Sequence, residues 1–120
     1  MKRTISILGS TGSIGLTTLK IIDKKKIFFK VFLLSADKNY KLIIKQIKKY
    51  KPEYFVINNY SVFLKIKNKK YKNCKIVNKL EEVIFKKAND LTICAIPGIA
   101  GLKPTIELIK YSKKIFLANK

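Results

Sequence analysis

The sequence predicts a single α/β domain built on a doubly wound, mostly parallel sheet. Short apolar runs rich in β-branched residues alternate with stretches whose apolar residues recur at helical spacing, and this alternation is typical of strands joined by crossover helices. A glycine-rich segment follows the first apolar run and precedes the first helical stretch, as in Rossmann-like domains. The length of 120 residues suits one domain, and the 48% hydrophobic content excludes the disordered class.

Six apolar runs are expected to be strands, because each is short and ends at glycine, proline or polar residues. They span residues 4–8, 29–35, 54–57, 75–77, 91–96 and 114–118. Helices are expected between them, where apolar side chains at helical spacing would form one face. The residues that define these helices are Ile14, Leu16, Leu19, Ile21 and Ile22, then Leu42, Ile43, Ile44 and Ile47, then 61–66, then Leu80, Val83, Ile84 and Phe85, and finally Leu102, Ile106 and Ile109.

The segment 9–15, with the sequence GSTGSIG, lies between the first strand and the first helix and is predicted to bind phosphate. Gly9 permits a tight turn away from the strand. Gly12 leaves out a side chain where the backbone approaches a pyrophosphate, and Gly15 allows the helix to pack closely. The N–H groups at the helix start and the positive end of its dipole would then hold the phosphates.

Hydroxyl groups strengthen this interpretation, because Thr11 and Ser13 can add hydrogen-bond donors to the backbone amides. The spacing is G-x-x-G-x-x-G rather than the more familiar G-x-G-x-x-G. Glycines that serve only the geometry of a strand–helix turn are therefore the alternative. Three glycines at these offsets, flanked by serine and threonine, favour nucleotide binding.

The residues after the second strand are expected to contact the ribose of a bound adenosine. They are Asp37, Lys38 and Asn39. A carboxylate here would accept from a ribose 2′-hydroxyl and favour NAD, whereas Lys38 and Asn39 would suit the 2′-phosphate of NADP. A polar helix cap is the alternative for Asp37 or Asn39. The residues alone leave the choice of cofactor open.

The net charge of +20 raises the question of a nucleic-acid or membrane partner. Only Arg3 among the 27 basic residues is arginine, and arginine is the side chain that suits bidentate phosphate and base recognition. The lysines are spread along the whole chain. We therefore expect a solvated lysine surface, with no nucleic-acid and no membrane partner.

Other classes of protein are disfavoured by what the sequence lacks. Two cysteines, Cys74 and Cys94, and no histidine argue against a structural zinc site, and the carboxylates show no metal-site grouping. No apolar stretch approaches the ~18 residues of a membrane span. The glycines at 9–15 interrupt the apolar N-terminal stretch, so no signal peptide is expected and the location should be cytoplasmic.

Four segments together resemble 1-deoxy-D-xylulose 5-phosphate reductoisomerase. They are ILGSTGSIG at 7–15, ADKN at 36–39, AIPGIAGLKPT at 95–105 and LANK at 117–120, in that family's order and spacing. The resemblance covers the whole chain but only the family's N-terminal NADPH-binding domain, so residues 1–120 are expected to be an N-terminal fragment. The family's metal-binding carboxylates and C-terminal domain would lie beyond it.

The resemblance also implies roles for particular residues. Thr11, Gly12, Ser13 and Ile14 would hold the NADPH pyrophosphate, Asp37, Lys38 and Asn39 would surround the 2′-phosphate, Asn119 would line the cofactor site, and Lys120 would contact the sugar-phosphate substrate. The loop at 97–101 would flank the nicotinamide side. No catalytic residue and no metal ligand is expected within this chain.

The activity implied by the resemblance is the conversion of 1-deoxy-D-xylulose 5-phosphate to 2-C-methyl-D-erythritol 4-phosphate in non-mevalonate isoprenoid biosynthesis. The full-length family uses NADPH and a divalent metal, Mg or Mn, and forms homodimers. This chain alone is expected to bind the cofactor without catalysis. Two alternatives remain, a basic module that binds polyanions or nucleic acid, and a small NAD-binding Rossmann subunit whose preference for NADH would come from Asp37.

Overall fold

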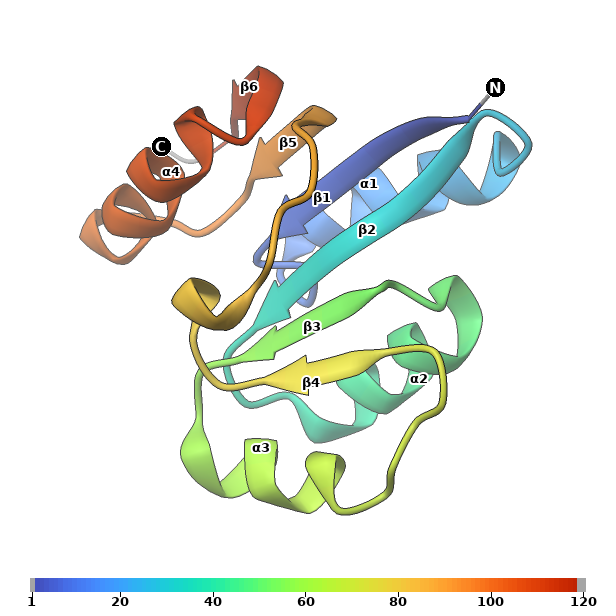
Figure 1. The fold of residues 1–120 in the computed structure, drawn as a ribbon, viewed down its shortest axis with the longest axis vertical. Helices are drawn as coiled ribbons and strands as arrows, with labels where there is room; N and C mark the ends of the chain where they lie inside the picture. The colour runs from blue at the N-terminus through green and yellow to red at the C-terminus, as the bar shows by residue number, and fades with distance from the viewer. Residues whose placement is uncertain (1, 119–120) are drawn as a thin grey trace.

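The computed structural model describes residues 2–118, and these form one six-stranded parallel sheet with the strand order β4-β3-β2-β1-β5-β6 (Figure 1). The strands are β1 Arg3–Leu8, β2 Phe29–Ala36, β3 Tyr54–Ile57, β4 Lys75–Val77, β5 Asn89–Cys94 and β6 Ser112–Leu117. The helices are α1 Ser13–Lys24, α2 Tyr40–Tyr50, α3 Tyr60–Lys67 and α4 Leu102–Ile109, with 3₁₀ turns η1 Leu80–Glu82 and η2 Ile99–Gly101. The predicted doubly wound α/β class is confirmed.

The two faces of the sheet are covered by different helices (Figure 1). Successive side chains of a strand point to opposite faces, so β1 contributes Ile5 and Ile7 to one core and Leu8 to the other. The first core is completed by apolar side chains of α1, α2 and α3. The second is covered by Leu108 of α4 and by Val83 in the connection between β4 and β5.

Most of the predicted elements lie within a residue or two of the observed ones, but the helix predicted around Leu80 to Phe85 is wrong. The chain forms only the turn η1 there. The Glu82 carboxylate accepts from the N–H groups of Asn78 and Lys79, each at 2.9 Å, and closes the turn. The Phe85 ring then stacks on Tyr111 at a centroid distance of 4.3 Å, and residues 83–88 form neither a helix nor a strand.

The apolar face predicted for the last helix is present, but it is not the face that packs on the sheet. Leu102, Ile106 and Ile109 of α4 are 57–59% exposed, whereas Leu108 on the other side of the helix is completely buried. In α1, Ile14 and Ile21 are likewise exposed, and the helix packs through Gly15, Leu19 and Ile22. Helical periodicity marks an apolar face without showing which partner covers it. The side of α4 turned away from the sheet is an apolar surface, and Ile99, Phe116 and Leu117 are exposed as well.

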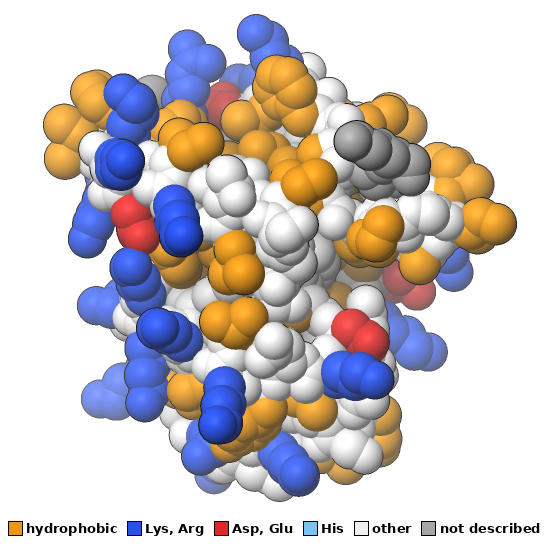
Figure 2. Space-filling model, turned by 180° about the vertical axis from the view of Figure 1, so that it is seen from behind, with side chains coloured by type: hydrophobic (Ala, Val, Ile, Leu, Met, Phe, Trp, Pro, Cys, Tyr) orange, Lys and Arg blue, Asp and Glu red, His pale blue; other side chains and the backbone are white. Residues whose placement is uncertain are grey.

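Lysine side chains are gathered at one edge of the face of the molecule on which α1 and α2 lie. Figure 2 views the helices from behind the sheet, and the basic side chains gather along the edge at which α1 and α2 end. Lys24 in the last turn of α1, and Lys48 and Lys49 in that of α2, lie at helix C-termini, where positive charge is favourable. No helix within residues 2–118 is long and apolar enough to cross a membrane.

Candidate functional site: a phosphate loop at the carboxyl edge of the sheet

The glycine-rich loop lies at the carboxyl end of β1, between neighbours β2 and β5. The chain runs outward from β1 in both directions, so this is the switch point at which doubly wound sheets bind ligands. Ser35, near the end of β2, anchors the loop: its carbonyl oxygen accepts from the N–H groups of Gly9 (3.0 Å) and Ser10 (2.8 Å). Its hydroxyl oxygen also accepts from the Gly9 N–H, at 3.1 Å.

A second anchor comes from α2. The Ser10 hydroxyl donates to Oε1 of Gln46 at 2.6 Å, and Nε2 of Gln46 donates to the Ser10 carbonyl oxygen at 3.0 Å. Both residues are buried, Ser10 completely. The pair therefore fixes the first turn of the loop from below. Sequence patterns gave no indication of it, because an isolated glutamine in an amphipathic helix resembles any polar position.

The three glycines of the loop have different roles. Gly9 has a φ of +82°, and a Cβ added to it would lie 3.0 Å from the Ala95 carbonyl oxygen. A Cβ on Gly15 would lie 2.3 Å from the carbonyl oxygen of Gly9, so the first turn of α1 packs directly on the loop. A Cβ on Gly12 would meet only that same oxygen, at 3.8 Å. Gly9 and Gly15 are thus required by the fold, whereas the fold alone would tolerate a side chain at Gly12.

The start of α1 is open to ligands. Gly12 is its N-cap, and no side chain caps the helix there. An uncapped helix start presents backbone N–H groups and the positive end of the helix dipole. Thr11 is half-buried, and Gly12, Ser13 and Ile14 are exposed beside these groups. The structure therefore brings these four predicted residues together around one group of donors suited to an anion.

The segment predicted to contact the ribose follows β2 at the same edge of the sheet. Asp37, Lys38 and Asn39 are all exposed. Asn39 is the N-cap of α2, and its Oδ1 accepts from the Leu42 N–H at 3.3 Å, as the helix-cap alternative predicted. The Asp37 carbonyl oxygen accepts from the Asn59 N–H at 3.1 Å, which ties this turn to the end of β3.

The remaining predicted site segments follow β5 and β6. The chain after β5 turns at Gly98 (φ +69°) into η2, and Gly101 approaches the Ile96 carbonyl so closely that an added Cβ would lie 2.4 Å away. Asn119 and Lys120 lie outside the described residues. Within residues 2–118 no three His, Cys, Asp or Glu side chains are grouped as metal ligands.

The one thiol near this edge is buried and poorly suited to act as a nucleophile. Cys94 ends β5, and burial raises the pKa of its thiol, although a hydrogen bond with Thr105 has the opposite effect. Burial alone raises the pKa of Cys74 to about 12. With no reactive thiol among the described residues at the carboxyl edge of the sheet, the open N–H groups at the start of α1 are its main functional feature, and they suit a phosphate-bearing ligand.

The fold and this loop define an α/β domain of the dinucleotide-binding class. A sequence model of the family 1-deoxy-D-xylulose 5-phosphate reductoisomerase matches residues 5–120, and the chain belongs to this family. The reductoisomerase of Pelagibacter ubique is 44% identical over 124 residues, and that of Clostridium novyi is 41% identical over 130 residues. Each alignment covers 98% of this chain and 32% of the relative.

Solved structures agree with this assignment. The reductoisomerase from Zymomonas mobilis in complex with NADPH superposes with a TM-score of 0.85 at 32% identity, over 99% of this chain and 32% of that one. A reductoisomerase in complex with NADPH, fosmidomycin and magnesium superposes with a TM-score of 0.82 at 27% identity, over 98% of this chain and 30% of that one. The chain thus spans about a third of the length of these relatives.

Proposed function

We propose that this chain is the NADPH-binding domain of a 1-deoxy-D-xylulose 5-phosphate reductoisomerase. The observation that carries the proposal is the uncapped start of α1 at Gly12, held at the switch point of the sheet by Ser35 and Gln46. The likeness to a relative solved in complex with NADPH supports it. The backbone N–H groups at the start of α1 suit the pyrophosphate of NADPH, because no side chain at Gly12 stands in front of them.

In this proposal Thr11, Gly12, Ser13 and Ile14 bind the pyrophosphate of NADPH. Asp37, Lys38 and Asn39 surround the adenosine ribose, where Lys38 pairs with the 2′-phosphate and Asn39 positions the turn as the cap of α2. Asn119 lines the cofactor site and Lys120 contacts the sugar-phosphate substrate. Ser35 and Gln46 are positioning residues, because they hold the loop without facing the ligand.

The reaction of the whole enzyme is part of the same proposal. NADPH would supply the hydride that reduces the rearranged sugar phosphate, and a divalent metal, Mg or Mn, would be held by carboxylates in the part of the family that this chain does not span. The described residues supply binding and orientation only. We therefore expect the 120-residue chain to bind NADPH without turnover, and the full-length enzyme to act as a cytoplasmic homodimer.

Fluorescence titration of the 120-residue chain with NADPH and with NADH tests the proposal. We expect saturable binding of NADPH and weaker binding of NADH, because Lys38 offers a partner only to the 2′-phosphate. Lys38→Glu should reverse that preference, and Asp37→Asn should strengthen NADPH binding by removing a repelling charge. Absence of binding of either dinucleotide at millimolar concentration would rule the proposal out.

The same titration addresses the two alternatives. A small NAD-binding subunit predicts that NADH binds more tightly and that Asp37→Asn weakens it. A polyanion-binding module predicts that DNA binds tightly, with a steep dependence on salt that is unchanged by a bulky residue at Gly12. Neither alternative accounts for the similarity to reductoisomerases along the whole chain.

A further inference from the structure

A hollow of about 690 Å³ lies at the opposite edge of the sheet from the phosphate loop. It is lined where the strands β1 to β5 begin and by the connection that leads into β5. In Figure 1 the strands β1 to β4 begin on the right and point left, toward the carboxyl edge. The hollow exists because the β4–β5 connection forms only the short turn η1, so no helix covers the sheet there.

Six lysines line this hollow. They are Lys2, Lys30, Lys72, Lys75, Lys86 and Lys87. The lining contains one carboxylate, Glu53, which pairs with Lys30 at 3.2 Å. The other five lysines form no ion pair with a described residue. Like charges that converge around a recess repel one another, and an anion held between them relieves the repulsion.

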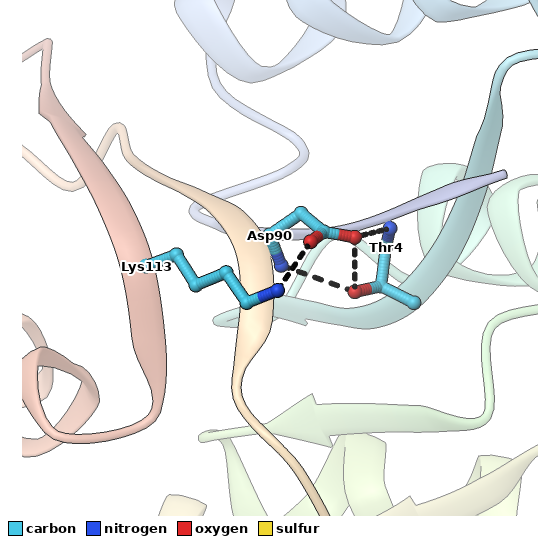
Figure 3. Close-up of polar contacts among 3 residues, drawn as sticks. All are labelled: Thr4, Asp90 and Lys113. Atoms are coloured by element: carbon cyan, nitrogen blue, oxygen red, sulfur yellow. Dashed lines mark hydrogen bonds and ion pairs between the residues drawn. The ribbon is translucent and has the colours of Figure 1, made fainter.

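The second observation is a buried donor that has no acceptor. Asn89, the first residue of β5, lines the hollow and is 2% exposed, and its Nδ2 has no hydrogen-bond partner among the described residues. The next residue, Asp90, has polar partners on both sides, Thr4 and Lys113, as Figure 3 shows. The Asp90 carboxylate accepts from the Thr4 N–H at 2.8 Å and pairs with Lys113 at 3.3 Å, and the Thr4 hydroxyl accepts from the Asp90 N–H. The Nδ2 atom of Asn89 has almost no exposed surface, so it can donate to a ligand oxygen only after the side-chain amide turns toward the hollow, and left unpaired it is unfavourable.

The shape and walls of the hollow restrict the ligand. Phe32 and Tyr54 form an aromatic wall, with their ring centroids 5.7 Å apart, and Lys75 lies over the Tyr54 ring. A recess of this volume admits a small molecule rather than an extended chain. Lysines act as point charges for phosphate groups, and several of them around one recess suit a ligand with more than one phosphate.

We propose that this hollow is a second anion site, which binds a compact polyphosphate, free or carried by a nucleoside. Lys86 and Lys87 neutralise its charge from the β4–β5 connection, and Asn89 donates to one of its oxygens once its side-chain amide has turned toward the hollow. The site lies at the edge of the sheet opposite to the phosphate loop and shares no residue with it. We therefore expect that binding there does not compete directly with NADPH.

Calorimetric titration of the 120-residue chain with tripolyphosphate at 150 mM salt tests this site. We expect a Kd that weakens at least tenfold in Lys86→Glu/Lys87→Glu and several-fold in Asn89→Leu. The matched control is Lys24→Glu/Lys25→Glu, which changes the net charge equally at the end of α1 and should alter the Kd less than twofold. If ATP binds more tightly than tripolyphosphate, the aromatic wall contacts the base of a nucleotide. If the two bind equally, the site recognises the polyphosphate alone.

Two further measurements keep the outcome decisive. Circular dichroism of each variant establishes that it is folded, and the Asn89 side-chain amide resonance should shift on addition of tripolyphosphate. If Lys86→Glu/Lys87→Glu and Lys24→Glu/Lys25→Glu weaken tripolyphosphate binding equally, the effect comes from the overall charge of the protein and the proposal is wrong. Loss of binding in Gly12→Val alone would place the probe in the phosphate loop and would equally overturn it.

Discussion

Ser10 in the phosphate loop is bonded through both its hydroxyl and its carbonyl to a single side chain, Gln46, which lies thirty-six residues later on α2. The two bonds are buried and reciprocal, so neither polar group can turn to water. The position of the loop over the carboxyl edge therefore depends on α2 as much as on the strand that precedes it.

Replacement of Gln46 by leucine should release this loop. The buried Ser10 carbonyl would lose its donor, and we expect the free energy of unfolding to fall by about 1–3 kcal/mol in urea denaturation. NADPH affinity should fall as well. Tyr50→Phe, one turn further along α2, removes a hydrogen bond to Asp23 far from the loop and should leave the affinity unchanged. Unaltered NADPH binding in Gln46→Leu would contradict a positioning role.

Gly15→Ala should lower the stability of the fold, whereas Gly12→Ala should mainly lower the affinity for NADPH. The Gly15 methyl would overlap the loop backbone, so we expect a loss of about 1–3 kcal/mol or more of stability. The Gly12 methyl meets nothing closer than 3.8 Å, so Gly12→Ala should remain within about 1 kcal/mol of wild type. Its NADPH affinity should nevertheless fall, because the methyl occupies the path of the pyrophosphate. Thermal melts and fluorescence titration of both variants separate the two roles.

Acid should weaken the contact between β1 and β5. The Thr4 N–H, together with Lys113, holds the pKa of Asp90 below its ordinary value of 3.8. A carboxylate whose pKa is lowered by folding contributes stability that is complete above the unfolded value and is lost as the pH falls through the folded one. Urea denaturation between pH 2 and 6 should therefore show a smaller decline at low pH for Asp90→Asn than for wild type.

Asp37→Asn is the matched control for this measurement, because Asp37 forms no ion pair with a described residue. Its acid decline should follow that of the wild type. An identical pH profile for wild type and Asp90→Asn would contradict the assignment of the decline to Asp90.

Two buried serines should respond differently to the loss of their hydroxyl. Ser6 in β1 is completely buried and its Oγ has no partner among the described residues, so Ser6→Ala should keep or raise the free energy of unfolding by up to about 1 kcal/mol. Ser35→Ala removes an acceptor for the Gly9 N–H and should lower it by about 1 kcal/mol. Urea denaturation of the two variants measures both free energies of unfolding. A larger loss of stability in Ser6→Ala than in Ser35→Ala would refute the prediction.

Most of the fold could be predicted from local signals in the sequence. The strands Tyr54–Ile57 and Lys75–Val77 agree with the predicted ranges, and the glycine loop lies where the strand–loop–helix order requires. The region after Leu80 was predicted wrongly because its apolar residues contact side chains distant in sequence, as Phe85 contacts Tyr111. Local periodicity contains no information about such partners.

The candidate site was predictable where it depends on backbone geometry and not where it depends on tertiary contacts. The glycine spacing predicted a helix start directly after the first strand, and α1 begins there with Gly12 as its N-cap. Gln46 could not be assigned, since its role depends on a hydrogen bond to a loop far away in sequence. The hollow around Asn89 was missed for the same reason, since five strand starts and one connection form it together.

The position of β1 inside the sheet has a consequence for synthesis of the chain. Residues 5–8 pair with 91–94 on one side, so this strand has an open edge until most of the chain has left the ribosome. Pairing of parallel strands over such separations is slow and leaves apolar surface exposed meanwhile. A nascent chain arrested before Leu91 would therefore present Leu8 and Leu33 to chaperones, because the core that covers them also needs Cys94 and Leu108.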